Sequence, residues 1–140
     1  MTAVVDASVV IKWFVPEVHG ETALHVLDAE DELLAPDHLF AETTNAIRKR
    51  VRQREFSAEE GREIISRIDA EVEIRLVSCR DLAGYAYEIA LTYGRSIYDA
   101  LYVALAVKRE TRLITADDRL YSALVGIPEI APHIQSLRDY

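Results

Sequence analysis

Four short apolar runs, each followed by a segment with helical spacing, constrain the fold of this chain more than any other feature. The runs lie at residues 2–6, 33–36, 74–78 and 112–115. The first of them, TAVVD, is rich in β-branched residues and lacks polar alternation, which suits a strand that is covered on both faces. Strands that alternate with helices form a mainly parallel sheet between helical layers. We therefore expect a three-layer α/β/α sandwich.

The segments between these runs predict helices, some with recognisable ends. Ser8 is expected to cap the first helix. Ser57, followed three residues later by Glu60, has the spacing of a capping box. Gly94 is the residue type that most readily ends a helix. The expected helices cover residues 8–14, 20–30, 38–54, 57–69, 80–93 and 97–109, and the tail is expected to add a short helix, a brief strand at 128–131 and a last turn or helix to Tyr140.

The composition fits one domain spanning residues 1–140. Apolar residues make up 50% of the chain and charged residues 29%, as in a soluble globular protein rather than a disordered one. No apolar run approaches the length of a membrane helix, and the single cysteine, Cys79, cannot form an internal disulfide, so we expect a reducing, cytoplasmic setting without membrane contact. The net charge of −8 repels nucleic acid at long range, so any RNA contact must be local.

Acidic residues follow the strands where a parallel sheet places its functional crevice. That crevice lies beyond the carboxyl ends of the strands, where the next helices begin. Asp6 ends the first strand, Asp117 and Asp118 follow the fourth, and Glu42 and Asp99 lie in the first turns of expected helices. Carboxylates gathered there repel one another, and a divalent cation relieves this. Mg²⁺ and Mn²⁺ prefer oxygen ligands and promote phosphodiester hydrolysis, which is the chemistry that these residues suit.

The same acids have a purely structural interpretation. Ser96 precedes Asp99 by three residues and Thr115 precedes Asp118 by three, which is the capping pattern, so these acids could serve only to cap helices. Asp6 differs, because it ends an apolar strand, where a carboxylate needs a partner.

Other chemically active groups give weaker signals. The four histidines lack metal-ligand spacing, and no glycine-rich phosphate loop is present. His38 follows the second strand and could approach the crevice, although a solvated loop histidine is the favoured interpretation. Cys79 is interpreted as a packed thiol rather than a nucleophile. The basic run from Arg48 to Arg54 fits either contact with RNA phosphates or a solvated helix end.

Four segments resemble the conserved blocks of PIN-domain proteins of the VapC toxin type. They read VVDASVVIKWF, APDHLFAETTNAIRKR, SIYDALYVALA and LITADDRL, and they cover nearly the whole chain in the family's order. The resemblance implies a PIN-like fold with about five parallel strands. It also implies an Mg²⁺ or Mn²⁺ ion in an acidic pocket and endonucleolytic RNA cleavage that leaves a 5′-phosphate and a 3′-hydroxyl.

The resemblance also implies roles for individual residues and partners. Asp6 and Asp99 would be the main metal ligands, and Asp118 would be a helix cap. The family's acidic positions fall on Asp6, Glu42, Asp99 and Asp117, and its supporting polar positions on Ser8, Asn45 and Thr115. The implied partners are an RNA substrate, a small cognate antitoxin and a second copy of the chain. Trp13 and Phe14 are core residues by their pattern and candidates for antitoxin contact by the resemblance.

Two other functions fit parts of the pattern. A phosphatase that forms a phosphoaspartate also places an aspartate after its first strand, but a site of the haloacid-dehalogenase type needs a second aspartate two residues later, where this chain has Ser8. A catalytically inactive PIN-like module that binds RNA or protein is the other alternative, and the presence of all four acids counts against it.

Overall fold

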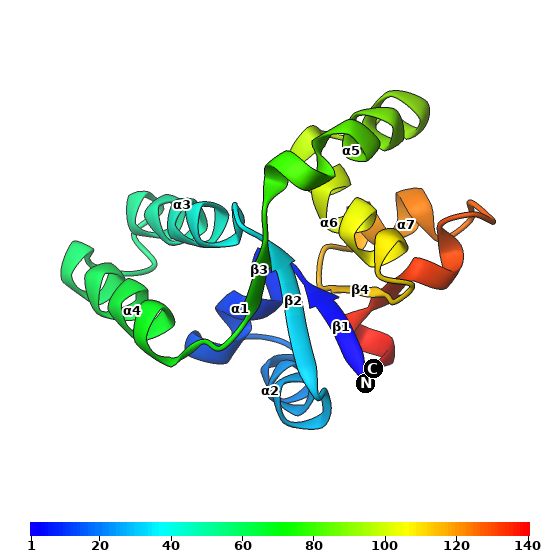
Figure 1. Ribbon diagram of the computed structural model, residues 1–140. Helices are drawn as coiled ribbons and strands as arrows, with labels where there is room; N and C mark the ends of the chain where they lie inside the picture. Colours follow the sequence, from blue (N-terminus) through cyan, green and yellow to red (C-terminus); the bar gives the residue numbers. More distant parts are fainter.

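The computed structural model describes residues 1–140 and has the expected sheet between helical layers (Figure 1). The sheet contains five strands, all parallel, in the order β3-β2-β1-β4-β5. The predicted α/β/α sandwich and its strand number are therefore confirmed. The strands are β1 (Thr2–Val5), β2 (Glu32–Pro36), β3 (Arg75–Val77), β4 (Leu113–Thr115) and β5 (Ile134–Ser136).

Helices cover both faces of this sheet. Helix α1 packs against β4, α2 and α3, whereas α6 packs across β1, β2 and β4, with α5 against it. Figure 1 shows α1 and α6 on opposite sides of the strands. The helices are α1 (Ala7–Phe14), α2 (Gly20–Ala29), α3 (Leu39–Arg52), α4 (Ala58–Glu71), α5 (Cys79–Tyr93), α6 (Ile97–Lys108) and α7 (Asp118–Leu124), followed by 3₁₀ turns at Ala131–His133 and Leu137–Asp139.

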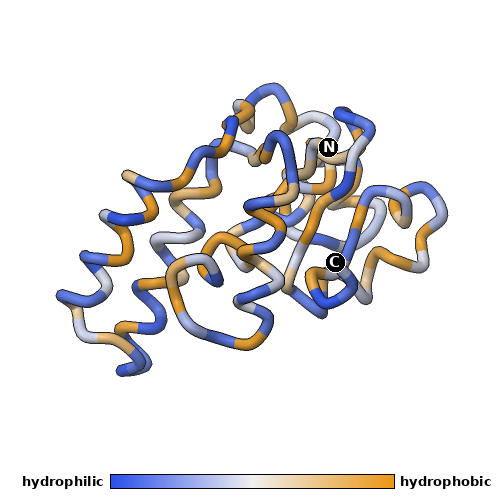
Figure 2. Tube along the Cα trace, turned by 90° about the horizontal axis from the view of Figure 1, so that it is seen from below, coloured by the Kyte–Doolittle hydropathy of each residue, from blue (hydrophilic) through white to orange (hydrophobic).

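The apolar pattern of each element matches its depth in the fold. Every residue from Ala100 to Ala106 in α6 is buried, as its continuous apolar run predicts. Helices α3 and α4 lie further out, and hydrophilic and hydrophobic residues alternate along them (Figure 2). They pack closely at Gly61, where a Cβ atom would lie 3.0 Å from a methyl group of Val51. None of the helices combines the length and the apolar character that crossing a membrane requires.

The helix ends agree with the sequence in part. Ser57 and Glu60 form both bonds of the predicted capping box. Gly94 ends α5 in the left-handed conformation, at φ 66°. The first helix is different, because its cap is Asp6, which accepts a hydrogen bond from the backbone N–H of Ser8. The prediction that Ser8 is the cap is wrong, since aspartate caps a helix as well as serine does and lies at the residue before the helix.

The predicted strand at residues 128–131 is also wrong. These residues form a turn and the first residue of a 3₁₀ helix, and the fifth strand begins later, at Ile134, where it pairs with β4. Pro128 and Pro132 lack the N–H group that a strand donates to its neighbour, and this moves the strand beyond them. The last helical turn, Leu137–Asp139, lies where it was expected.

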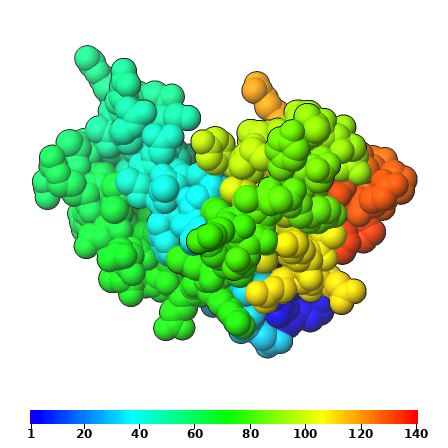
Figure 3. Space-filling model, turned by 45° about the horizontal axis from the view of Figure 1, so that its top comes forward, coloured from blue at the N-terminus to red at the C-terminus, as the bar shows by residue number.

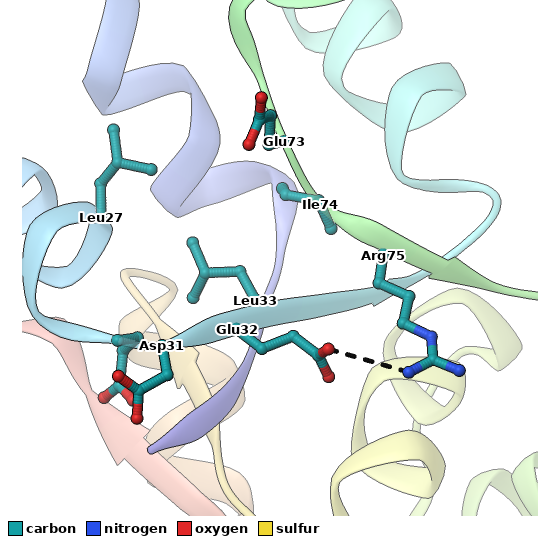
Figure 4. A pocket seen from close by; sticks show the side chains of 8 residues that line it. Leu27, Asp31, Glu32, Leu33, Glu73, Ile74 and Arg75 are labelled. Carbon is teal, nitrogen blue, oxygen red and sulfur yellow. Dashed lines mark ion pairs between the residues drawn. The ribbon is translucent and has the colours of Figure 1, made fainter.

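A buried ion pair joins distant parts of the chain at the amino end of the sheet. The side chain of Glu30 is 3% exposed, and it accepts hydrogen bonds from Arg112 and from the Tyr140 hydroxyl. Glu32 and Arg75 form a second pair nearby, at 3.7 Å, which lines an open pocket at the starts of β2 and β3 (Figure 4). The first pair is shielded from water and the second is exposed to it.

We predict that Arg112→Ala lowers the free energy of unfolding by about 3 kcal/mol, because it leaves the buried Glu30 carboxylate with only the exposed N-terminal ammonium group, 3.9 Å away, as a cation. Arg75→Ala is the matched control, and since its pair is exposed it should cost less than about 1 kcal/mol. Urea denaturation of both variants measures the difference. Equal losses in the two variants would contradict the assigned role of Glu30.

Candidate active site

Acids from four elements meet at the carboxyl end of the sheet. The chain leaves β1 toward β2 and reaches β4, on the other side of β1, only after α5 and α6. Ligands of parallel sheets bind at such a switch point. Asp6 follows β1, Asp117 follows β4, and Glu42 and Asp99 lie in the first turns of α3 and α6. Figure 3 shows a hollow in the surface between the α3–α4 part and the α5–α6 part of the molecule.

Asp6 is buried, at 6% exposure, and both of its carboxylate oxygens are hydrogen-bonded. Oδ1 accepts bonds from the Ser8 hydroxyl and, at 3.0 Å, from the Ser8 backbone N–H. Oδ2 accepts a bond of 2.5 Å from the Thr115 hydroxyl. Backbone N–H groups orient these hydroxyls, because Ala116 donates to Ser8 Oγ at 2.9 Å and Asp117 to Thr115 Oγ1 at 3.0 Å. The network joins β1, α1 and the end of β4.

The charges of these acids act on one another. Burial, together with the smaller effect of the Asp117 charge, raises the pKa of Asp6 to about 6, against the effect of its hydrogen bonds from Ser8 and Thr115. Burial also raises the pKa of Asp99, and the charges of Asp117 and Glu42 add to the rise. A cation placed among these groups would lower both pKa values. The electrostatics of the site therefore favour a bound cation.

The two adjacent acids after β4 have different surroundings. Asp117 is the N-cap of α7, since its Oδ1 accepts hydrogen bonds from the backbone N–H groups of Arg119 and Leu120 at 3.0 and 3.1 Å. Asp118 is exposed and pairs with Arg138. Of the two acids, Asp117 is the one whose charge acts on the other carboxylates of the site.

The prediction that Asp118 caps this helix is therefore wrong. It was based on the spacing from Thr115, but the Thr115 hydroxyl donates its hydrogen bond to the Asp6 carboxylate. The same spacing before α6 does produce a helix cap, because Ser96 Oγ accepts a hydrogen bond of 3.1 Å from the backbone N–H of Asp99. That bond uses the Asp99 backbone, and its carboxylate remains near the other acids.

Two residues that the site prediction omitted contact Glu42. The buried Tyr102 donates its hydroxyl proton to Glu42 Oε1 at 2.7 Å, and His38 Nε2 lies 3.3 Å from the same oxygen. Burial would raise the pKa of Glu42, but these two partners outweigh it, so that the pKa is lowered. Interpreting His38 as a solvated loop residue is wrong. The sequence could have placed Tyr102 near the site, because Tyr102 lies three residues after Asp99 and therefore on the same face of the helix.

The remaining predicted site residue, Asn45, lies outside this network. It is exposed and accepts a hydrogen bond of 3.2 Å from Arg48 Nε. Cys79 packs against the core with Sγ 3.5 Å from His38 Nδ1, and burial raises the pKa of its thiol. A raised pKa disfavours the thiolate, in agreement with the interpretation of Cys79 as a packed thiol.

Trp13 and the basic run from Arg48 to Arg54 both make contacts within the protein. Trp13 is buried and donates a hydrogen bond of 2.7 Å to the carbonyl oxygen of Ala23, so its place in the core is confirmed. In the basic run, Arg50 pairs with Glu17 at 2.7 Å.

The donor set suits a hard divalent cation in an open site. All four acids offer carboxylate oxygens, the ligands that Mg²⁺ and Mn²⁺ prefer, and the raised pKa values of Asp6 and Asp99 reflect burial first and neighbouring negative charge second. In this structure no three or more His, Cys, Asp or Glu side chains lie close enough together to hold a metal ion by themselves. An ion here would therefore keep several water ligands, as Mg²⁺ usually does.

Sequence comparisons agree with this arrangement. The model of the PIN domain family matches residues 3–124. The chain is 31% identical over 121 residues to Ribonuclease VapC3 of Pyrobaculum aerophilum, an alignment that covers 86% of this chain and 92% of the relative. It is 33% identical over 125 residues to Ribonuclease VapC1 of Mycobacterium tuberculosis, with 89% and 92% covered.

Solved structures show the same fold. PAE2754 from Pyrobaculum aerophilum matches with a TM-score of 0.70 and 17% identity, covering 99% of this chain and 85% of that one. A toxin-antitoxin complex from Klebsiella pneumoniae matches with a TM-score of 0.64 and 16% identity, covering 99% of both chains. The family model spans the positions of all four acids, and the two relatives align over most of the chain. This chain belongs to the PIN-domain family and, within it, to the VapC group.

Proposed function

We propose that this chain is a metal-dependent endoribonuclease and the toxin of a toxin-antitoxin pair. The observation that carries the proposal is the meeting of Asp6, Glu42, Asp99 and Asp117 at one end of the sheet, where burial and, to a lesser degree, neighbouring negative charge raise the pKa values of Asp6 and Asp99. The names of the two relatives, both ribonucleases, support RNA as the substrate.

Asp6 and Asp99 would be the main ligands of an Mg²⁺ or Mn²⁺ ion, with Glu42 and Asp117 completing the site. When bound, the ion would lower the pKa of water and offset charge on the scissile phosphate. Water attacks the phosphorus in line and the 3′ oxygen departs, which gives a 5′-phosphate and a 3′-hydroxyl. No side-chain nucleophile is needed.

The other polar residues of the site position these acids. Ser8 and Thr115 orient the Asp6 carboxylate and favour its charged form. Tyr102 and His38 both contact Oε1 of Glu42, and no protein group donates a hydrogen bond to Oε2. The second oxygen of Glu42 is therefore available to a cation or to the attacking water.

The proposed partners are a small antitoxin and a second copy of the chain. The membership of the relatives in the VapC group and the toxin-antitoxin complex among the structures with this fold support the antitoxin. A basic residue of that partner would neutralise the acids when it reaches the site. An apolar strip on α5 supports self-association, because Tyr87 and Leu91 lie one turn apart and are exposed.

The first prediction concerns the metal. The purified protein, free of any partner, should cleave RNA with Mg²⁺ or Mn²⁺ and not in EDTA, because clustered carboxylates alone offer no charge stabilisation. Gel analysis of end-labelled RNA measures this, and added Mg²⁺ should restore cleavage. Full activity in excess chelator would overturn the metal mechanism. RNA binding without cleavage in any metal would favour the inactive module, and phosphate release from small phosphoesters would favour a phosphatase.

The second prediction separates catalytic acids from structural ones. Asp6→Asn and Asp99→Asn should each lower cleavage at least ~100-fold, the scale of losing a key electrostatic group. Asn caps helices as well as Asp, so Asp117→Asn should lose activity while its melting temperature stays nearly constant. Asp118→Asn is the matched control and should keep both, since it loses only an exposed ion pair. The assignment fails if Asp118→Asn is inactive and Asp117→Asn is active.

The third prediction concerns pH and the metal-free protein. The pKa of Asp6 is about 6 in the folded state, above its ordinary value of 3.8, so the folded state binds the proton more tightly than the unfolded state does. Stability should fall as the pH rises from about 4 to about 6, by up to about 1.4 kcal/mol per pH unit. Asp6→Asn lacks this group, and its stability should therefore rise relative to the wild type across that window. Urea denaturation in EDTA at several pH values measures the difference, and parallel pH curves would refute it.

A further inference from the structure

An exposed aromatic ring lies directly beside the acidic site. Tyr98 precedes Asp99 in the first turn of α6, and it is 62% exposed. Its backbone carbonyl oxygen lies 3.1 Å from His38 Nε2, the atom that is also close to Glu42. Its ring centroid is 6.2 Å from that of His38, with the planes tilted by 32°. Contacts with a residue of the site therefore fix the position of this tyrosine.

Tyr98 is the outer member of a row of three rings. The His38 ring lies between Tyr98 and Tyr102, and its centroid is 4.8 Å from that of Tyr102. Tyr102, at the inner end, is buried and donates its hydroxyl proton to Glu42. Ring separations of this size are typical of aromatic pairs in folded proteins. The row extends from the carboxylates to the surface, where the Tyr98 ring remains open to solvent.

We propose, on the basis of the proposed function, that Tyr98 stacks one base of the RNA next to the scissile phosphate. Single-stranded RNA is commonly held by stacking of its bases on aromatic side chains. The Tyr98 ring adjoins His38, which contacts Glu42, and this position is close enough to the acids for contact with a base that flanks the scissile phosphate.

The charge of the molecule makes this contact more important. The net charge is −8, and the acids of the site repel phosphates, so phosphate contacts alone would hold the substrate poorly. Stacking does not depend on net charge. Arg95 lies near Asp99, since its charge opposes the burial that raises the pKa of that carboxyl, and we assign to Arg95 the phosphate contact in this proposal.

The test measures RNA binding in EDTA, where cleavage is blocked. The probe is a short fluorescent single-stranded RNA that spans a cleavage site mapped on a longer transcript with Mg²⁺ present. Tyr98→Ala should weaken binding about tenfold, the usual effect of losing one stacked base, and Tyr98→Phe should bind as the wild type does. Tyr85→Ala is the matched control, since Tyr85 is 37% exposed and lies on α5 outside the strip of Tyr87 and Leu91, and it should have no effect.

Salt dependence distinguishes stacking from charge. In Tyr98→Ala the slope of log affinity against log salt should be unchanged, whereas Arg95→Gln should reduce it by about one. A reduced slope in Tyr98→Ala would overturn stacking as the source of the effect.

Removal of single bases from the RNA locates the contact. One abasic position next to the cleavage site should weaken binding to the wild type about tenfold and have no further effect on Tyr98→Ala, because both changes remove the same contact. Additive losses at every position would overturn the proposal, as would a changed oligomeric state of Tyr98→Ala in light scattering with unchanged RNA affinity. If the wild type cleaves RNA but Tyr98→Ala binds normally, only this proposal fails. If the wild type neither binds nor cleaves RNA, the proposed function fails with it.

Discussion

The arrangement of this molecule depends on one buried carboxylate at the end of β1. Asp6 is satisfied by hydroxyl groups from α1 and from the end of β4, and these are oriented by the backbone that follows β4. A buried charge without partners costs several kcal/mol, so these three elements cannot shift independently without that cost. Their fixed relation determines where α7 begins and hence where Asp117 lies. The site is thus a consequence of satisfying Asp6.

The acids of the site differ in character because their surroundings differ. Burial and neighbouring negative charge raise the pKa values of Asp6 and Asp99, whereas two partners lower that of Glu42. Asp117 is less specialised, since it also caps a helix. Unequal environments are how a protein assigns different tasks to chemically similar groups. Sites with such shifted pKa values are common where chemistry rather than stability has determined the residues.

The sequence predicted what local patterns encode. The strands β1, β2 and β4 and the helix α6 are largely buried, and continuous apolar runs in the sequence predict such buried elements. Local patterns did not distinguish Asp6 from Ser8 as a cap, or Asp117 from Asp118, because adjacent residues of similar capping ability compete for the same N–H groups. The contact of Tyr102 with Glu42 joins residues 60 apart in the chain, and no spacing rule describes it. The same reason explains why His38 was misjudged, since its partners come from other elements.

The edge strands of the sheet restrict how this molecule can associate with other chains. Both β3 and β5 are only three residues long. Short edge strands present few free backbone donors and acceptors to another chain, and a charged residue such as Arg75 at the start of β3 hinders strand addition further. The sheet therefore resists extension from one molecule into the next, and this protects the molecule from edge-to-edge aggregation. Association is left to helix surfaces, where side chains can change without disturbing the backbone pairing that holds the acids in place.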